Sequence, residues 1–342
     1  MRPDAPEILD YFADQGVEIK VISGDHPATV ASVARRAGVS NAALGVDARQ
    51  LPEEGPALAD AVTRASVFGR VTPHQKRAMV AALQARGRTV AMTGDGVNDV
   101  LALKDADMGI AMGGGSSASR AVAQLVLLDN RFATLPRVLA EGRRVINNIE
   151  RVANLFIAKA GYAVLLTALI GLVGSPFPFH PKQLTLIGTF SIGVPGFFLA
   201  LAPDTALVRP GFLRRVLSYS LPAGIAAATA TFACYEVVRR SSATLAEART
   251  GATVTLLALG LVILVSVSRP VRAWKLVLAA AMALSYVAVI AVELGRNYFE
   301  MDMPPASGWV AVMICVLGGG LLVMLLPNLA ARVTARLSAR AA

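Results

Sequence analysis

Two hydrophobic patterns divide the chain. Over residues 1–135 short apolar runs alternate with amphipathic stretches, and from about residue 153 onward the apolar runs are long and almost free of charge. The first pattern predicts strands alternating with helices, which form a mostly parallel sheet with helices on both faces, as in a Rossmann-like α/β fold. The second predicts an all-α transmembrane region. We therefore expect a soluble domain at 1–135, a connecting helix at 136–152, a transmembrane domain at 153–330 and a basic tail at 331–342.

Periodicity and turn residues place ten elements in the soluble region. Helices are expected at 5–14, 27–37, 73–86, 97–106 and 116–121, and strands at 17–22, 67–71, 89–92, 108–111 and 125–128. Residues 41–55 fit neither pattern and are expected to form a connecting loop.

Six apolar runs in the second region approach the roughly 20 residues that a helix needs to cross a bilayer. They cover 153–173, 184–202, 217–238, 252–268, 276–294 and 309–326. Basic residues cluster before the first run and after the second, fourth and sixth, and such clusters favour the cytoplasmic side. This predicts a multi-pass protein of the cell membrane with its soluble domain and carboxyl terminus in the cytoplasm. The basic loop at 239–249 is an exception.

Composition supports a membrane protein. The chain is 55% hydrophobic and 16% charged, with a net charge of +10 that comes largely from arginines beside the apolar runs. Anionic membrane lipid explains this charge, and nucleic-acid binding is not expected because aromatic and basic residues are not interleaved. Cys234 and Cys315 lie in apolar runs without metal-ligand spacing and are expected to be small core or lipid-facing residues.

The most informative polar stretch is 93–99. Its sequence, TGDGVND, places two carboxylates, a carboxamide and two glycines at the carboxyl end of an expected strand. Open α/β sheets bind ligands at that end. Mg²⁺ prefers carboxylates, water and phosphate oxygens, so Asp95 is a candidate metal ligand and the Asn98 amide is a candidate donor to a phosphoryl oxygen. The turn predicts a site for Mg²⁺ beside a phosphate.

Two further polar clusters follow expected strands. Ser23, Gly24 and Asp25 form a turn before a helix, where backbone N–H groups favour a phosphate, although an ordinary helix N-cap has the same composition. Arg70 precedes an expected helix that carries Lys76 on its first turn, where an ammonium group can neutralise a phosphoryl oxygen. Together the three clusters predict one phosphate site.

In this order the motifs resemble the phosphorylation domain of P-type ATPases, which has the haloacid-dehalogenase-like fold, and the resemblance continues through 106–129. It implies ATP as substrate and Mg²⁺ as cofactor. It also implies roles for individual residues: catalysis for Lys76, Asp95 and Asp99; contact with nucleotide or phosphate for Ser23, Gly24, Asp25, Arg70, Lys76 and Asn98; and Mg²⁺ binding for Asp95 and Asp99, with Asp99 ordering the turn.

The family's nucleophile does not occur in this sequence. It is an aspartate in a DKTGT turn, whose carboxylate attacks the γ-phosphoryl group of ATP, and residues 1–342 contain no such motif. In the family the strand that carries it is central, so we expect an incomplete domain with an unpaired sheet interior. The chain is expected to be the carboxyl-terminal portion of a pump that is inactive without its amino-terminal half. The alternative is a natural, non-catalytic half-pump that binds Mg²⁺ or phosphate or pairs with a separately encoded partner.

The first two apolar runs carry the candidate ion pathway. Residues 132–173 are expected to form one helix, and its start resembles the stalk of P-type pumps. The helix contains Lys159, whose charge inside a span is expensive. Lys159 is expected either to act as a built-in counter-ion or to extend its side chain toward the cytoplasm. Glycine and proline, including Pro195, interrupt the second run at 188–196 and free backbone carbonyls there. These carbonyls and the hydroxyls of Thr189 and Ser191 can coordinate a cation. The alternative is a simple proline kink.

The identity of the cation is less well defined by the sequence. In calcium-pump relatives these two spans also carry acidic and amide ligands, whereas residues 153–202 contain no Asp or Glu. The family resemblance alone implies calcium or another divalent cation. The missing acidic residues suggest fewer ions moved per cycle than in the two-site calcium pumps.

Overall fold

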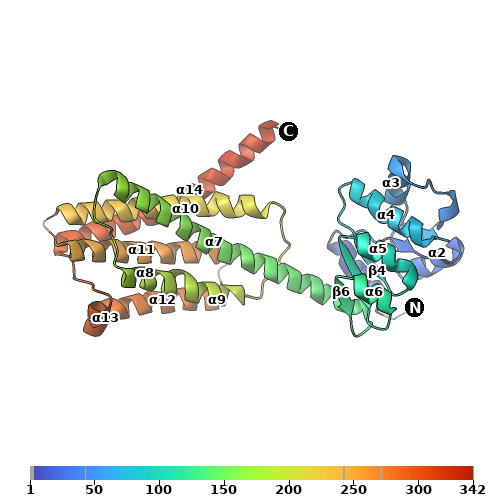
Figure 1. Ribbon diagram of the computed structural model, residues 1–342, viewed down its shortest axis with the longest axis horizontal. Helices are drawn as coiled ribbons and strands as arrows, with labels where there is room; N and C mark the ends of the chain where they lie inside the picture. Colours follow the sequence, from blue (N-terminus) through green and yellow to red (C-terminus); the bar gives the residue numbers. More distant parts are fainter. Residues whose placement is uncertain (1–3, 43, 242, 270–271, 342) are drawn as a thin grey trace. The chain divides into compact units, whose positions relative to one another are not determined.

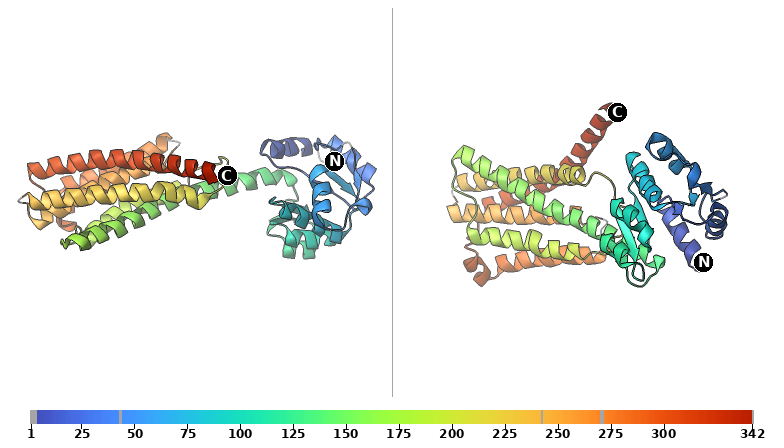
Figure 2. Two further views of the ribbon diagram at one scale, coloured as in Figure 1. Left: turned by 90° about the horizontal axis from the view of Figure 1, so that it is seen from above. Right: turned by 45° about the vertical axis from the view of Figure 1, so that its right-hand side comes forward.

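The computed structural model describes residues 4–42, 44–241, 243–269 and 272–341, and for 330–341 it describes the backbone only. It divides into two compact units, Met1–Ala140 and Glu141–Ala342. Figures 1 and 2 show short strands with covering helices in the first unit and long helices in the second. We describe each unit by itself.

The first unit alternates strands and helices, as predicted. Its strands are β1 (Val21–Ile22), β2 (Val46–Asp47), β3 (Val67–Gly69), β4 (Ala91–Gly94), β5 (Met108–Met112) and β6 (Leu125–Leu127). Its α-helices are α1 (Ala5–Asp14), α2 (Pro27–Arg36), α3 (Gly55–Arg64), α4 (Pro73–Ala85), α5 (Val100–Asp105) and α6 (Ser117–Val122), and η1 (Ala48–Gln50), η2 (Val97–Asp99) and η3 (Phe132–Thr134) are short 3₁₀ turns.

The strands form two parallel sheets rather than one. Three strands pair in the order β1-β3-β2 and three in the order β4-β5-β6. All pairs are parallel, as the alternating pattern predicted. β1 and β4 each lie at the end of their sheet, so within the described residues each leaves one edge unpaired. The single expected sheet is therefore divided, because no described strand pairs with those two edges.

The segment 41–55, expected as a loop, contains β2 and η1, and α3 follows it. β2 pairs with β3 over two residues, Val46 with Phe68 and Asp47 with Gly69. Helix α3 buries Leu58 and Val62 in a cluster with Phe68 of β3. A strand of two residues is too short to show alternation in the sequence, which explains why the prediction there was wrong.

The second unit is helical, and its helices range from short turns to long segments. They are α7 (Leu135–Val173, which begins in the first unit), α8 (Pro181–Gly188), η4 (Thr189–Gly193), α9 (Val194–Ala200), α10 (Phe212–Arg240), α11 (Leu245–Val267), α12 (Ala273–Ala291), α13 (Glu293–Tyr298) and α14 (Ala306–Ala341). Within the described residues, six helical segments are long and apolar enough to cross a membrane, which agrees with the six predicted runs.

Two segments of the second unit differ from what the sequence predicted: the end of the fifth run and the tail. The fifth run was expected to continue to residue 294, but α12 ends at Ala291, because Val292 is extended with φ −88° and ψ 127° and α13 begins after it. The expected tail at 331–342 continues α14 as far as Ala341, and residue 342 lies outside the described residues.

Candidate functional site

The turn after β4 is folded around the side chain of Asp99. Gly94 allows this, since a Cβ at that position would lie 2.6 Å from the Cβ of Asp99. The Gly96 N–H donates to Oδ2 of Asp99 at 3.3 Å, and Oγ of the buried Ser119 donates to the Gly96 carbonyl at 2.7 Å. Gly94 thus gives the backbone the close approach to Asp99 that this compact turn requires.

Lys76 meets Asp99 from a different element. A capping box of Thr72 and Gln75 fixes the start of α4, which places Lys76 on the first turn of that helix. The Nζ atom of Lys76 lies 2.6 Å from Oδ1 of Asp99, and each side chain is 11% exposed. Both oxygens of Asp99 therefore have donors, and the ion pair ties α4 to the 93–99 turn.

The backbone of Asp95 is fixed by contacts with the chain around Ser116, and its side chain is exposed to solvent. Its carbonyl accepts from the Ser116 N–H at 2.8 Å, and a Cβ on Gly115 would lie 2.7 Å from that same carbonyl oxygen. The Asp95 residue is exposed, as is Asn98. Among the described residues, no hydrogen bond or ion pair involves the Asp95 carboxylate. This carboxylate is thus the available acidic group of the turn.

The exposed Asp95 carboxylate and Asn98 amide fit a Mg²⁺ ion that is bound mainly by water and substrate phosphate. In the described part of the chain no group of three or more His, Cys, Asp or Glu residues surrounds a potential metal position. Mg²⁺ keeps several waters and binds through one or two carboxylates together with substrate phosphates. One exposed carboxylate beside an exposed amide matches that mode and does not match a complete protein cage.

The second polar cluster lies at the ends of β1 and β3. The Arg70 N–H donates to the Asp25 carbonyl at 2.7 Å, and the Val71 N–H donates to the Ser23 carbonyl at 3.0 Å. The Asp25 N–H donates to Oγ of Ser23 at 3.2 Å, and Gly24 beside them is exposed. Arg70 has a φ of +56°, a left-handed conformation that is uncommon outside glycine. The structure therefore brings Arg70 against the Ser23–Asp25 turn.

Asp47, at the end of β2, belongs to this cluster and was missed in the sequence. Its Oδ2 accepts from Nη1 of Arg70 at 3.0 Å and from Nη2 of Arg49 at 2.7 Å. The Arg49 guanidinium, together with the Arg49 backbone N–H and Arg70, holds the pKa of Asp47 well below its usual range. The only local signal was an acid two residues before an arginine, in a segment interpreted as a loop.

Helix α4 joins the two clusters, with Arg70 just before it and Lys76 on its first turn. The structure thus brings Lys76 to Asp99, and Arg70 to Ser23 and Asp25. In the described residues no hydrogen bond or ion pair runs directly from the Ser23–Asp25 turn to the 93–99 turn.

The second unit holds the expected ion-pathway residues at an irregular helix. The interruption expected at 188–196 is a π-helical turn, η4, between α8 and α9. Ser191 is buried there, with its Oγ 3.0 Å from the hydroxyl of Tyr286 on α12. A Cβ on Gly260 of α11 would lie 2.6 Å from that Oγ, so glycine is needed beside it. π-Turns are often found at functional positions.

The remaining ion-pathway residues differ in exposure. Pro195 is buried and Thr189 is exposed. Lys159 of α7 is half-buried, and its Nζ would lie 3.3 Å from a Cβ on Gly188. Three of the four residues therefore lie at or beside the interior of the helical unit, whereas Thr189 is on its surface.

A polar network ties α7 to the chain that follows α9. Nδ2 of Asn148 donates to the carbonyls of Ala200 and Ala202 at 2.9 and 2.8 Å. Arg151 donates to Oδ1 of Asn148 at 3.1 Å and forms an ion pair with Asp204. The Arg151 side chain is 9% exposed and that of Asp204 18% exposed. We call Asn148, Arg151 and Asp204 the α7–α9 network.

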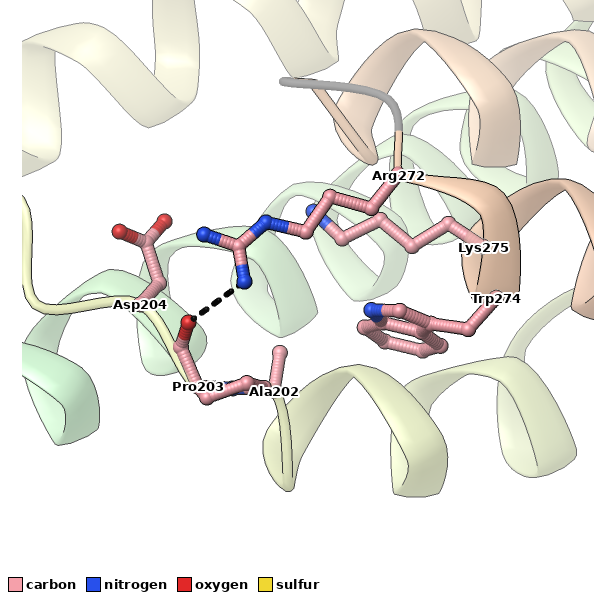
Figure 3. A pocket seen from close by; sticks show the side chains of 6 residues that line it. All are labelled: Ala202, Pro203, Asp204, Arg272, Trp274 and Lys275. Atoms are coloured by element: carbon pink, nitrogen blue, oxygen red, sulfur yellow. Dashed lines mark hydrogen bonds between the residues drawn. The ribbon is translucent and has the colours of Figure 1, made fainter.

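The start of α12 lies beside this network. Figure 3 shows Asp204, Arg272, Trp274 and Lys275 around a small pocket of about 10 Å³. Nη1 of Arg272 donates to the Pro203 carbonyl at 3.4 Å, as the dashed line in Figure 3 marks. Burial raises the pKa of Asp204, but the hydrogen bonds from Arg151 and the Ala206 N–H, together with the positive charges of Arg151 and Lys275, outweigh it, so the net pKa is lowered.

The comparisons with known proteins agree with this architecture. A family model described as haloacid dehalogenase-like hydrolase matches residues 1–107. A calcium-transporting ATPase CtpE of Mycolicibacterium smegmatis is 51% identical over 316 residues, which are 88% of this chain and 40% of that protein. The CtpE of Mycobacterium bovis is 50% identical over 93% of this chain and 42% of its own length.

Two further proteins are more distant. A probable cation-transporting ATPase, exp7, of Streptococcus pneumoniae is 41% identical over 66% of this chain and 30% of its own length. A solved structure of the catalytic domain of the CPx-ATPase CopB-B is 26% identical and covers 40% of this chain, with a TM-score of 0.31; that superposition is too weak to compare geometry.

The fold, the 93–99 turn and the family model define a haloacid-dehalogenase-type parallel α/β segment, followed in the described part of the chain by six membrane-length helices. The chain belongs to the P-type cation-transporting ATPases and is related over most of its length to the CtpE calcium-transporting ATPases. It spans about 40% of the length of those relatives.

Proposed function

We propose that the chain is the C-terminal part of an ATP-driven, Mg²⁺-dependent pump that moves calcium, or another divalent cation, across the cell membrane. The observation that carries the proposal is the Lys76–Asp99 ion pair of 2.6 Å, which holds the turn that presents the exposed Asp95. The names of two relatives, calcium-transporting ATPases, support calcium as the first candidate. The first unit and the carboxyl terminus then lie in the cytoplasm, as the basic clusters predict.

The α/β residues divide into three roles in this proposal. Asp95 binds Mg²⁺, which neutralises charge on the transferred phosphoryl group when bound. Lys76 contributes positive charge to the same phosphoryl group, while Asp99 keeps Lys76 and the turn in place. Asn98 donates to a phosphoryl oxygen. The N-terminal turn of α2, with Ser23, Gly24, Asp25 and Arg70 around it, contacts nucleotide or phosphate.

We further propose that the 342 residues do not hydrolyse ATP by themselves. The carboxylate that forms the acyl phosphate has to come from a DKTGT turn, which they lack. The unpaired edges of β1 and β4 support this, since each can accept a further strand. An apolar hollow of about 310 Å³ beside β1, lined by residues such as Leu9, Ile19 and Val21, offers room for the side chains of that strand.

Coupling to the membrane is proposed to run through α7. Its segment 136–152 acts as a stalk, and the α7–α9 network attaches that helix to the end of the second span. A displacement of α7 then moves α9 and the adjoining π-turn, which carries Ser191 and leads to Pro195. Residues 153–202 contain no acidic residue, so the cation ligands of this region are neutral oxygens, and Lys159 adds a fixed positive charge nearby. Such a site fits fewer cations per cycle than a site with two carboxylates.

The test uses the intact pump, in which this chain is joined to its amino-terminal part, in sealed vesicles. We expect ATP-dependent uptake of radioactive calcium that Asp95→Asn abolishes. Ser191→Ala and Lys159→Ala should alter the calcium concentration for half-maximal uptake. Ser285→Ala is the matched control, since Ser285 is half-buried on α12 and donates to the Ala281 carbonyl of its own helix. Unchanged uptake in Asp95→Asn would overturn the proposed role of the turn.

The alternative, a non-catalytic half-pump, follows from the same missing motif. Reading the DNA upstream of the Met1 codon separates the two. An in-frame sequence encoding Asp-Lys-Thr-Gly-Thr supports one continuous pump, whereas a stop codon with no such motif nearby supports the half-pump.

A further inference from the structure

Two cysteines far apart in the sequence lie on neighbouring helices of the second unit. Cys234 belongs to α10 and is fully buried. Cys315 belongs to α14 and is half-buried, and both are free thiols. Helices α10 and α14 pack along one another (Figure 1). This pair is independent of the proposed transport function.

Close contacts at glycines define how α10 and α14 face each other. A Cβ added at Gly319 would lie 2.6 Å from the Cβ of Ala230, and one added at Gly308 would lie 3.5 Å from Cγ1 of Val238. The residue number rises along α10 as it falls along α14, so the helices run antiparallel. Glycine at such contacts lets two helix backbones approach closely.

The same register places the two cysteines opposite each other. Cys234 lies four residues after Ala230, and Cys315 lies four residues before Gly319. Four residues are about one helical turn, so both side chains point along the contacting faces one turn from the Ala230–Gly319 contact. The two cysteine side chains also interact directly with each other.

A contact from α11 agrees with this placement. A Cβ on Gly251 would lie 3.8 Å from Sγ of Cys234 and 3.5 Å from Cγ2 of Val312. Val312 lies three residues before Cys315 on the same helix, a spacing that puts the two on one face. Gly251 thus touches Cys234 and the α14 face that carries Cys315.

We propose that Cys234 and Cys315 form a modification site, a pair of thiols that hydrogen peroxide oxidises to a disulfide between α10 and α14. A disulfide needs Cα atoms about 4.4–6.8 Å apart, and the contact of Gly319 with Ala230, one helical turn from the cysteines, brings the two helix backbones close together. The bond ties α10 to α14 and prevents one helix from sliding along the other.

The chemistry balances with one peroxide per pair. The more accessible sulfur, that of Cys315, loses two electrons to the peroxide and becomes a sulfenic acid, with release of one water. The Cys234 sulfur then attacks that sulfur, and the new S–S bond forms as a second water leaves. Two thiols and one peroxide therefore give one disulfide and two waters.

The experiment uses the whole 342-residue chain in detergent micelles. After treatment with hydrogen peroxide, remaining thiols are alkylated and the denatured chain is cleaved at methionine with cyanogen bromide. Cys234 then lies in fragment 113–282 and Cys315 in fragment 314–324. We expect the two fragments to stay joined, by mass spectrometry, until a reductant is added, and Cys234→Ser or Cys315→Ser to release them.

A matched variant tests the register. Cys315→Ser combined with Ile314→Cys keeps one thiol on α14 but moves it to a position that is 65% exposed, and we expect no joined fragments. The proposal is overturned if the wild-type fragments separate after oxidation. It is also overturned if the displaced cysteine links as efficiently, because the link would then not depend on the α10–α14 register.

Discussion

The two units hold their charged side chains in opposite ways. In the α/β unit the Lys76–Asp99 pair supports a turn from which Asp95 is exposed, so the charge at the tip of the turn is available to a ligand. In the helical unit the Arg151–Asp204 pair is largely buried, and Arg151 also donates to Asn148, whose amide donates to backbone carbonyls at the end of α9. The first arrangement presents a group for binding, whereas the second fastens one helix to another.

Arg151→Met should have the largest effect on stability, since it removes the charged partner of Asp204 and the donor to Oδ1 of Asn148. Removing one partner of a buried ion pair costs roughly 3–5 kcal/mol. We expect that loss in the free energy of unfolding of the helical unit, followed by the fluorescence of Trp274, which lines the neighbouring pocket.

Arg144→Ala is the control for that variant. Arg144 pairs with Glu141, which is 61% exposed, and donates to the Leu201 carbonyl at 3.3 Å. Exposed pairs of this kind contribute about 0.3–0.5 kcal/mol, so we expect a much smaller loss than for Arg151→Met. Equal losses in the two variants would show that the α7–α9 network does not fasten α7.

Lys76→Met should have a smaller effect, confined to the α/β unit. Both side chains of its pair are 11% exposed, so solvent partly screens the unpaired Asp99, and we expect a loss of about 2–3 kcal/mol. Hydrogen exchange measured by mass spectrometry on peptides covering 93–99 should show faster exchange there. The double variant Lys76→Met with Asp99→Leu, which removes both charges, should recover part of the protection.

Gly94→Ala tests the close packing of the same turn. The added methyl group would lie 2.6 Å from the Cβ of Asp99, and forcing a group into a filled space costs about 1–3 kcal/mol. Gly24→Ala is the matched control, because its nearest atom would be 3.9 Å away. Exchange in 93–99 should rise for the first variant only; a normal turn in Gly94→Ala would contradict the packing described.

The smallest expected effect concerns the pH dependence of the α/β unit. Asp47 has a folded-state pKa below its unfolded value, chiefly because of Arg49. Its stabilisation is therefore complete above the unfolded pKa of about 3.9 and declines as the pH falls through the folded pKa. Asp47→Asn should flatten the change of hydrogen-exchange protection in residues 44–50 over that acidic range. An unchanged profile would mean that the pair with Arg49 contributes nothing to folding.

Local patterns were enough to predict most elements of both units. The TGDGVND turn stood out because its polar residues follow an apolar strand, and the membrane helices stood out because each apolar run is long. The contacts inside and around the turn could not be predicted from the local pattern. Nothing in the spacing of Lys76 and Asp99 shows that they touch. The clusters at strand ends placed Lys76 and the turn in one phosphate site, and the family resemblance added a role for Asp99.

Long-range contacts account for what the sequence did not reveal. Arg151 contributed to the prediction of membrane orientation, yet in the structure it binds Asp204, which lies beyond the second span. Asp47 was overlooked because β2 has two residues and shows no alternation. Cys234 and Cys315 each looked like a small residue in an apolar run, and their pairing depends on the packing of α10 against α14.

The most direct test of the proposed incomplete catalytic site is phosphoenzyme formation from ATP labelled at the γ-phosphate. The 342-residue chain alone should form none, whereas the same chain joined to its amino-terminal part should form an acid-stable, hydroxylamine-sensitive phosphoenzyme that Asp95→Asn reduces strongly. A hydroxylamine-sensitive phosphoenzyme on the 342 residues alone would contradict the proposal, because it would place a nucleophilic carboxylate within this chain.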